Sequence, residues 1–132
     1  MTACPCGSGD TDANCCMKYI SGNEWPKTAE QLMRSRYTAF TLANVDYLNK
    51  TQDPETRSDQ NPEDLKDWAK SVTWLGLEVL RTSRGKAEDQ KGVVEFIARF
   101  KDDQGPQQIH EVSQFRRIAG RWMYSTGSHH DE

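Results

Sequence analysis

Hydrophobic and polar residues alternate along the second half of the chain. The alternation runs through four segments rich in β-branched and aromatic residues, at 72–81, 92–101, 107–118 and 121–126. Turn signals separate them at Arg84-Gly85, at 102–106 and at Ala119-Gly120. Because the connections are short, the four segments predict the strands of an antiparallel meander.

The first half of the chain shows a helical period instead. Thr28, with Gln31 three residues later, predicts a capping box that opens a helix. The apolar face of this helix comprises Leu32, Met33, Tyr37 and Phe40. Asn44 predicts the cap of a second, short helix. Asn61, followed by Pro62, predicts the start of a third helix, with apolar positions at Leu65, Trp68 and Ala69. Helices followed by strands predict an α+β fold, in which the helices cover one face of a curved antiparallel sheet.

The alternation also assigns strand residues to the two faces of the sheet. One face of the second strand is apolar, with Val94, Phe96, Ala98 and Phe100, while Glu95 and Arg99 lie on the other face. In the third strand one face carries Ile109, Glu111, Ser113 and Phe115. A carboxylate and a hydroxyl inside an apolar frame are typical of the wall of a pocket.

Composition and charge limit the classes of function. A chain of 132 residues with 35% hydrophobic residues predicts one globular domain of modest size. A membrane-spanning helix needs roughly 20 consecutive apolar residues, and charged residues interrupt every apolar run before that length. The first residues have no basic, apolar leader, so we expect a cytoplasmic protein. The net charge of −3 provides no overall cationic field, so neither nucleic acid nor a membrane is an expected partner.

All four cysteines lie near the start of the chain, at Cys4, Cys6, Cys15 and Cys16. In a reducing cytosol, thiols this close in sequence are more often metal ligands than disulfides. Disulfides between Cys15 and Cys16, or between Cys4 and Cys6, would be strained, whereas cross-paired disulfides are compatible with a location outside the cell. Four thiolates can complete a tetrahedral shell around one Zn²⁺. We therefore expect a structural zinc site without an open coordination position.

The residues around the cysteines suit such a site. The glycine-serine-glycine stretch at 7–9 could turn its amides toward the sulfurs. Asn14 predicts the cap of a short helix from Cys15 to Ile20, which would place the last two thiolates at its positive end. Because about twenty residues bury too little apolar surface to fold alone, the metal is expected to supply most of the stability of this segment.

The string Cys-Pro-Cys-Gly-Ser-Gly at 4–9, followed by the Cys15-Cys16 pair, resembles the SEC-C zinc module, which is also found at the C-terminus of the SecA translocation motor. The whole chain resembles the bacterial YchJ family, on the stretches at 32–40, 46–48, 74–77, 96–100, 110–115 and 122–124. This resemblance implies a central domain of the nuclear-transport-factor-2-like (NTF2-like) cone fold. We accordingly divide the chain into a zinc module at 1–22, an NTF2-like domain at 27–127 and a polar tail at 128–132.

Two features depart from the pattern that the resemblance implies. SEC-C loops commonly carry lysines before the final cysteine pair, and in SecA such a module resembles a docking site for the chaperone SecB and for ribosomes. Here the stretch at 10–14 contains two aspartates instead, which disfavours binding to phosphate or to an acidic partner. The family also often has a histidine where this chain has Asp53, so any chemistry of that histidine does not apply here.

The cone fold commonly holds a pocket between the sheet and the helices. The resemblance therefore makes candidates of the polar residues near such a pocket: Arg36, Tyr37, Asp46, Arg99, His110, Glu111 and Ser113. The alternative, which we favour, is structural. In that interpretation Arg36 or Arg99 forms an ion pair with Glu111 or Asp46, and Tyr37 and Tyr47 are core residues with satisfied hydroxyls.

Three hypotheses about function follow. The first is a zinc-binding protein-interaction module of the bacterial cytoplasm, whose partner, from resemblance, belongs to the secretion or ribosome-associated machinery. The second is a protein that binds a small molecule in the cone cavity, or an isomerase-like or dehydratase-like enzyme there. The enzyme would need a base such as His110 or Glu111, which as neighbours on a strand face opposite ways, and a donor such as Tyr37 or Tyr47. The third is a zinc staple that only holds the N-terminus to the domain.

Overall fold

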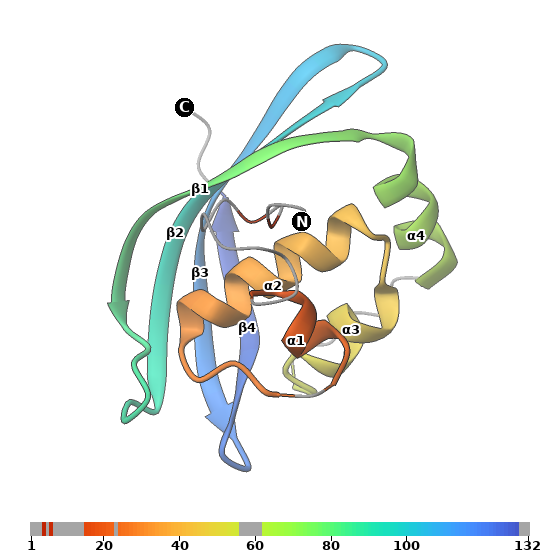
Figure 1. Cartoon of the computed structure of the whole chain (residues 1–132). Helices are drawn as coiled ribbons and strands as arrows, with labels where there is room; N and C mark the ends of the chain where they lie inside the picture. Colours follow the sequence, from red (N-terminus) through yellow and green to blue (C-terminus); the bar gives the residue numbers. More distant parts are fainter. Residues whose placement is uncertain (1–3, 5, 7–14, 23, 56–61, 130–132) are drawn as a thin grey trace.

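A four-stranded antiparallel sheet forms the larger layer of the computed structural model (Figure 1), which describes residues 4, 6, 15–22, 24–55 and 62–129. The strands are β1 (Thr73–Arg84), β2 (Lys91–Asp102), β3 (Gly105–Ile118) and β4 (Arg121–His129). They pair in sequence order, β1-β2-β3-β4, with every neighbour antiparallel. The meander predicted from the alternation is confirmed.

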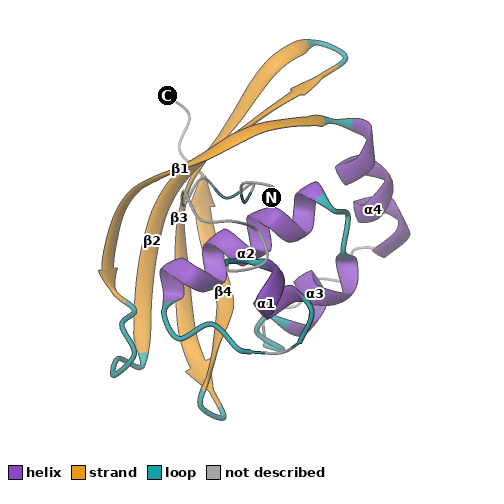
Figure 2. Cartoon of the chain, in the orientation of Figure 1, coloured by secondary structure: helices purple, strands orange, loops and turns teal. Residues whose placement is uncertain are grey.

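The described helices are α1 (Met17–Ile20), α2 (Ala29–Thr41), α3 (Val45–Lys50) and α4 (Pro62–Ser71). Figure 2 shows them together on one side of the curved sheet, with α2 lying along its face and α4 at one end. This is the α+β arrangement that the order of helices and strands predicted. No helix in the described parts of the chain is long and apolar enough to span a membrane.

Side-chain caps fix the starts of two helices. The Thr28 hydroxyl accepts a hydrogen bond from the Gln31 backbone N–H at 3.1 Å, so the predicted cap of α2 is confirmed. The Gln31 side chain in turn accepts from the N–H of Lys27, one residue earlier than in a standard capping box. Asn44 caps α3 through a 3.1 Å bond from the Tyr47 N–H. The predicted cap of α4, Asn61, lies outside the described residues.

The core lies between the sheet and α2. Its buried members come from one face of the helix and one face of the strands: Ala29, Leu32, Met33, Tyr37, Val94, Phe96, Ala98, Phe115 and Trp122. The predicted face of β2 is therefore the buried one. A smaller apolar cluster joins α1 to α2 and α3 through Tyr19, Ala39, Tyr47 and Leu48. Burial of this apolar surface is the main force that attaches the helices to the sheet.

Close backbone packing holds the start of α2 against the hairpin between β1 and β2. The Ala29 N–H donates to the Gly85 carbonyl at 2.8 Å. A Cβ atom on Gly92 would lie 2.5 Å from the Gly85 Cα and 3.1 Å from the Ala29 Cβ. Only glycine leaves room for this contact, and Gly85 also has a positive φ of 77°.

The chain after α3 adds a short parallel bridge to β4. Gln52 lies opposite Tyr124 in this bridge. The Asp53 N–H donates to the Tyr124 carbonyl at 2.8 Å, and the Tyr124 N–H donates to the Thr51 carbonyl at 2.9 Å. The segment after α3 thus contacts the sheet through residues 51–53.

The strand ends differ from the predicted ones. All four strands are longer than predicted, because hairpin pairing continues past the alternating apolar positions: β1 reaches Arg84, β3 already begins at Gly105 and β4 extends to His129. His129 is paired with Glu111 in the sheet. The first two residues of the predicted polar tail therefore belong to β4, and residues 130–132 lie outside the described part.

Candidate functional site

The four cysteine sulfurs lie together. All four Sγ atoms are within 4.8 Å of one another, with Cys6 and Cys15 separated by 3.5 Å and Cys15 and Cys16 by 3.8 Å. Cys4, Cys6 and Cys16 are buried, while Cys15 is half-buried. No disulfide links these cysteines, all four of which the structure describes. We call this group the cysteine cluster.

The spacing of the sulfurs fits one tetrahedral ion. Four sulfurs at about 2.3 Å from a central Zn²⁺ would lie about 3.8 Å apart. The distances from the Cys15 sulfur to those of Cys6 and Cys16, 3.5 and 3.8 Å, are close to that value, and all pairs of sulfurs lie within 4.8 Å. The cysteine cluster could therefore hold a metal ion.

The close packing of the four thiols disfavours negative charge. The neighbouring Cys6 sulfur and burial both raise the pKa of the Cys16 thiol above its ordinary value. Sulfurs this close cannot all ionise unless a cation compensates them. A divalent ion would reverse this preference, because a coordinated thiol is deprotonated.

Helix α1 places the second pair of cysteines. Cys16 is its N-cap residue, and its carbonyl accepts hydrogen bonds from the Tyr19 and Ile20 N–H groups, both at 3.0 Å. We predicted that this helix would include both cysteines, but it begins only at Met17, because Cys15 and Cys16 form a turn before it. The predicted cap at Asn14 and the glycine-serine stretch at 7–9 lie outside the described residues.

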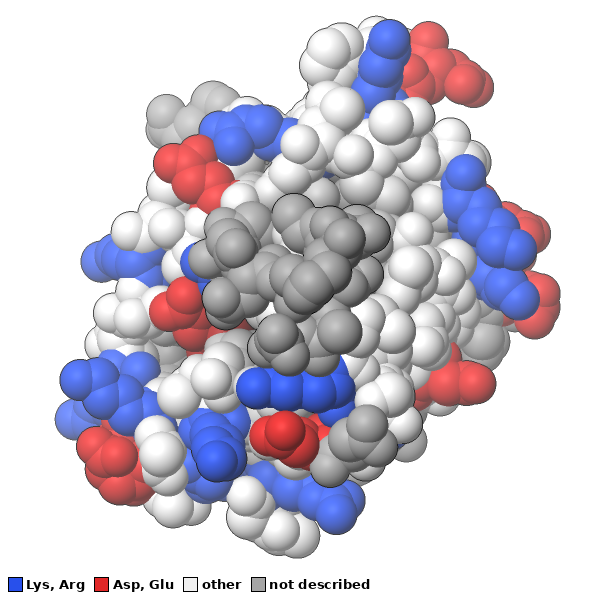
Figure 3. Space-filling view, viewed as in Figure 1, with Lys and Arg blue, Asp and Glu red and all other residues white. Residues whose placement is uncertain are grey.

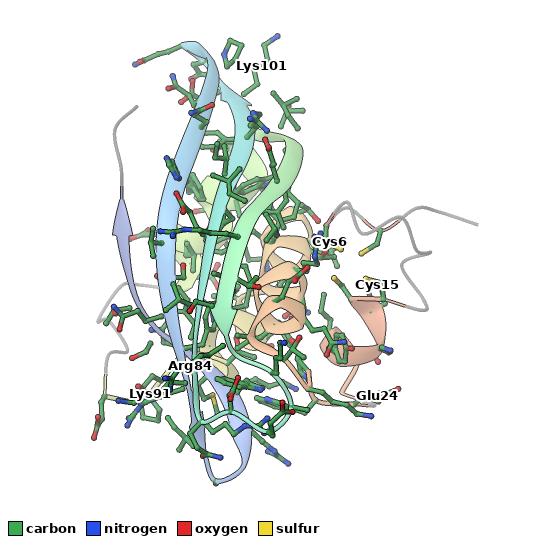
Figure 4. The ribbon with its side chains drawn as sticks, turned by 90° about the vertical axis from the view of Figure 1, so that its left-hand side faces the viewer. Cys6, Cys15, Glu24, Arg84, Lys91 and Lys101 are labelled. Atoms are coloured by element: carbon green, nitrogen blue, oxygen red, sulfur yellow. The ribbon has the colours of Figure 1, made fainter. Side chains whose placement is uncertain are left out.

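Two side chains of helix α2 contact the cysteine cluster. Figure 4 shows α2 between the sheet and the segments that carry Cys6 and Cys15. The Thr38 hydroxyl, which is buried, lies 3.7 Å from the Cys4 sulfur. Arg34 donates a 2.7 Å hydrogen bond to the Cys6 carbonyl. These contacts bring a donor and a positive charge to a site where four thiolates and a divalent ion would sum to −2.

The module is not a separate appendage. Leu77 of β1 packs against the cysteine cluster, and the Tyr19 ring is buried among residues of α2 and α3. The described part of residues 1–22 therefore shares apolar surface with the domain that follows it.

A cavity of about 160 Å³ lies between the sheet and the helices. Its lining residues come from α2, α4 and all four strands: Met33, Arg36, Tyr37, Phe40, Trp68, Trp74, Phe96, Ala98, Ile109, Glu111 and Tyr124. Three of the seven predicted pocket residues, Arg36, Tyr37 and Glu111, are among them. Ser113 is fully buried beside the cavity and donates to Glu111.

The polar side of the cavity is hydrogen-bonded. The Glu111 carboxylate accepts from the Ser113 hydroxyl and, at 2.8 Å, from the Tyr124 hydroxyl. Arg36 donates to the Leu48 carbonyl at 2.9 Å and to the Thr51 hydroxyl at 2.7 Å, and its guanidinium lies over the Tyr124 ring at 4.5 Å.

Burial changes the pKa values of this group. It lowers the pKa of Arg36 to about 10, although the Tyr124 hydroxyl and the Glu111 carboxylate oppose that change. Burial, with the charge of Glu111, raises the pKa of Tyr124 above its ordinary value. Arg36 thus remains cationic and Tyr124 remains a hydrogen-bond donor at neutral pH.

The other predicted pocket residues lie elsewhere. Arg99 is on the outer face of the sheet, where it pairs with Glu78 at 3.0 Å. His110 is also on that face and contacts Glu95 at 2.6 Å. Asp46 is exposed in the first turn of α3, where a negative charge favours the helix. None of these three residues lines the cavity, so the expectation that they do is corrected.

The structural interpretation of the tyrosines holds in part. Tyr47 is buried and its hydroxyl lies 2.7 Å from the Ser35 hydroxyl, as expected for a core residue. Tyr37 is buried too, and the Gly76 backbone bonds to its hydroxyl, but its ring also lines the cavity. The predicted ion pairs with Asp46 do not form, because Asp46 points away from the core.

Several cavity residues were missed from the sequence. Tyr124, whose hydroxyl donates to Glu111, follows the buried Trp122 by two residues, so the alternation in β4 carried a signal for it. The contributions of Trp68 and Trp74 depend on how α4 packs on β1: the Trp74 indole donates to the Ala69 carbonyl at 3.1 Å, and the two rings meet edge to face. No local pattern specifies that contact.

Comparison with known proteins agrees with this architecture. Residues 28–127 match the family model described as "YchJ, middle NTF2-like domain". A UPF0225 protein of Geobacter sulfurreducens is 42% identical over 124 residues, which cover 94% of this chain and 77% of the relative. A UPF0225 protein of Chromobacterium violaceum is 45% identical over 126 residues, covering 95% and 91%.

Two solved structures are similar over almost the whole chain. The solution structure of a SEC-C motif containing protein from Rhodopseudomonas palustris superimposes with a TM-score of 0.86 at 40% identity, covering 97% of this chain and 98% of that one. The crystal structure of a SEC-C motif containing protein from Psychrobacter arcticus gives a TM-score of 0.80 at 30% identity, covering 98% and 83%. With these matches and the described fold, the chain belongs to the YchJ family and carries its NTF2-like domain behind an N-terminal cysteine cluster.

Proposed function

We propose that the cysteine cluster binds one structural Zn²⁺ through Cys4, Cys6, Cys15 and Cys16. The observation that carries this proposal is the convergence of four sulfurs within 4.8 Å of one another. Four thiolates complete a tetrahedral shell, so no position is left for a substrate or a water molecule, which is typical of structural rather than catalytic zinc. Soft thiolate ligands in this geometry favour zinc over magnesium, calcium or manganese.

We further propose that the zinc-loaded module is a protein-interaction module of the bacterial cytoplasm, an accessory of the secretion or ribosome-associated machinery. Similarity to SEC-C motif containing proteins supports this role. Large apolar side chains are exposed at Leu42, Leu75 and Leu80.

The distribution of charge favours a protein partner over nucleic acid. On the face shown in Figure 3, basic and acidic side chains lie next to one another around the rim, and they form no continuous field of one sign. The net charge is −3. Such a surface gives little of the phosphate attraction that supplies most non-specific binding to nucleic acids.

Metal content of untagged protein, purified under reducing conditions, tests the zinc proposal. We expect one zinc ion per chain in the wild type and a loss of stoichiometric zinc in Cys15→Ser. Ser21→Ala is a matched control, because Ser21 lies just after α1, is exposed and is not part of the cluster. Absence of any metal from fresh, reduced wild-type protein would refute the site, while stoichiometric iron would refute the identity of the ion.

Binding to purified components tests the interaction role. Zinc-loaded protein is mixed with bacterial ribosomes in a sedimentation assay and with purified SecA and SecB in a surface-binding assay. We expect saturable binding to at least one of them, lost in Cys15→Ser and retained in Ser21→Ala. If none of the three binds, the proposed link to secretion and ribosomes is wrong, and the zinc serves only as a staple.

A further inference from the structure

The cavity beside α2 has the size of a single aromatic ring. Its volume of about 160 Å³ is close to that of an engineered cavity of about 150 Å³ that holds benzene. Aromatic side chains from five elements surround it: Tyr37 and Phe40 from α2, Trp68 from α4, Trp74 from β1, Phe96 from β2 and Tyr124 from β4. Faces and edges of these rings offer contact to a flat, apolar guest.

The lining also carries a polar group that no apolar guest would use. Glu111, Tyr124 and Arg36 all line the cavity. The Glu111 carboxylate accepts hydrogen bonds from the hydroxyls of Tyr124 and Ser113. Because a carboxylate can accept several hydrogen bonds, and because the Tyr124 oxygen can still accept one while its O–H donates to Glu111, a guest hydroxyl could donate to either of these groups.

The charges at this polar group compensate each other. The negative charge of Glu111 stabilises the positive charge of Arg36, and the Arg36 guanidinium is held by backbone and hydroxyl acceptors outside the cavity. A guest carboxylate would meet the carboxylate of Glu111, and a guest ammonium would meet the guanidinium of Arg36. Either charge would also lose its hydration among the aromatic rings. A neutral guest avoids both costs.

From these observations we propose that the cavity binds a small, neutral, single-ring aromatic molecule that carries a hydroxyl group. The ring would lie among Tyr37, Trp68 and Trp74, and the hydroxyl would join Glu111 and Tyr124. This binding site uses none of the four cysteines, so it stands or falls independently of the zinc proposal.

Titration of the full-length, isotope-labelled protein with phenol, toluene and benzoate tests this proposal by NMR. Phenol and toluene have nearly the same shape, but only phenol has the hydroxyl. The four indole N–H signals locate the guest, because Trp68 and Trp74 line the cavity, whereas Trp25 and Trp122 do not.

We expect saturable phenol binding that shifts the Trp68 and Trp74 signals. Toluene should bind about tenfold more weakly, the usual effect of one lost hydrogen bond to a buried charged group. Benzoate should not bind. Absence of saturable phenol binding, or shifts centred on Trp25 and Trp122, would overturn the site. Equal affinity for phenol and toluene, or tighter binding of benzoate, would overturn the assigned ligand class.

Variants separate the two parts of the site. Ala98→Leu places a larger side chain into the cavity and should abolish phenol binding. Glu111→Gln should remove most of the preference for phenol over toluene. Glu95→Gln is the matched control, because Glu95 lies on the opposite face of the sheet and contacts Arg81 and His110 there. If Ala98→Leu does not fold, the indole shifts of the wild type still decide whether the cavity is occupied.

Discussion

Asp53 forms the buried end of an ion pair that joins the chain after α3 to the sheet. Its side chain is 1% exposed and accepts two hydrogen bonds from Arg116, at 2.6 and 3.0 Å. The Ser125 hydroxyl adds a bond of 3.2 Å and the Glu55 N–H one of 2.9 Å. We predict that Asp53→Asn destabilises the protein, because the variant keeps the shape of the side chain but removes the charge that Arg116 meets.

The lowered pKa of Asp53 sets an upper limit on how much this ion pair contributes to the free energy of unfolding. The hydrogen bond from Arg116 is the largest cause that lowers this pKa from 3.8 to about 2. That difference corresponds to about 2.5 kcal/mol at most. The Arg116 side chain is 36% exposed, so water screens the pair and the expected contribution falls to about 1–2 kcal/mol.

A double-mutant cycle of Asp53→Asn and Arg116→Gln measures this contribution by urea denaturation at pH 7. The matched control is the cycle of Glu55→Gln with Arg116→Gln. Glu55 also pairs with Arg116, at 2.9 Å, but its side chain is 76% exposed. We expect a coupling of about 1–2 kcal/mol for Asp53 and close to zero for Glu55. Equal couplings would refute the argument that burial makes the Asp53 pair important.

The pH dependence supplies a second check. A carboxylate whose pKa is lower in the folded state contributes stability that is fully present above its unfolded pKa and is lost as the pH falls through its folded pKa. The stability difference between the wild type and Asp53→Asn should therefore stay constant from pH 7 to about 5, shrink progressively around and below pH 4, and be mostly lost by about pH 2. A difference that already shrinks between pH 7 and 5 would contradict the lowered pKa.

Three further substitutions test other parts of the structure. Gly92→Ala should destabilise the protein by about 2 kcal/mol or more, because the new Cβ would collide with Gly85, and thermal unfolding measures this. Trp122→Phe should cost about 2–3 kcal/mol in urea denaturation, since the fully buried indole also donates to a carbonyl at 3.0 Å. Thr38→Val should speed the transfer of zinc to a chelator about tenfold, because the hydroxyl beside Cys4 is lost while the shape is kept; an unchanged rate would contradict its supporting role.

Local chemistry accounts for what could be predicted from the sequence. Thr28 and Asn44 cap their helices because each cap depends only on residues a few positions away. Alternation placed Glu111 and Ser113 on the buried face of β3, because the face of a strand residue depends only on its position among its neighbours. The proximity of the four cysteines followed from the preference of clustered thiols for a shared ion.

The remaining features depend on contacts between distant parts of the chain. Arg116 and Asp53 are separated by 63 residues, and no local pattern joins them. Arg99 and His110 were expected near the cavity, although alternation alone places both on the outer face of the sheet, opposite Phe96 and Glu111. Their ion-pair partners, Glu78 and Glu95, also lie on the outer face. The cavity itself depends on the packing angle of α4, which follows from the contact of Trp68 with Trp74.

The parallel bridge at Gln52 occupies part of the outer edge of β4. The outer edge of a sheet offers unpaired peptide groups to which a strand of another molecule can add, and this is a common start of aggregation. In the middle of β4, the Tyr124 N–H and carbonyl are already taken by Thr51 and Asp53 of the same chain. A strand of another copy could not pair with β4 at Tyr124 without first displacing residues 51–53. This bridge therefore disfavours edge-to-edge association at this position.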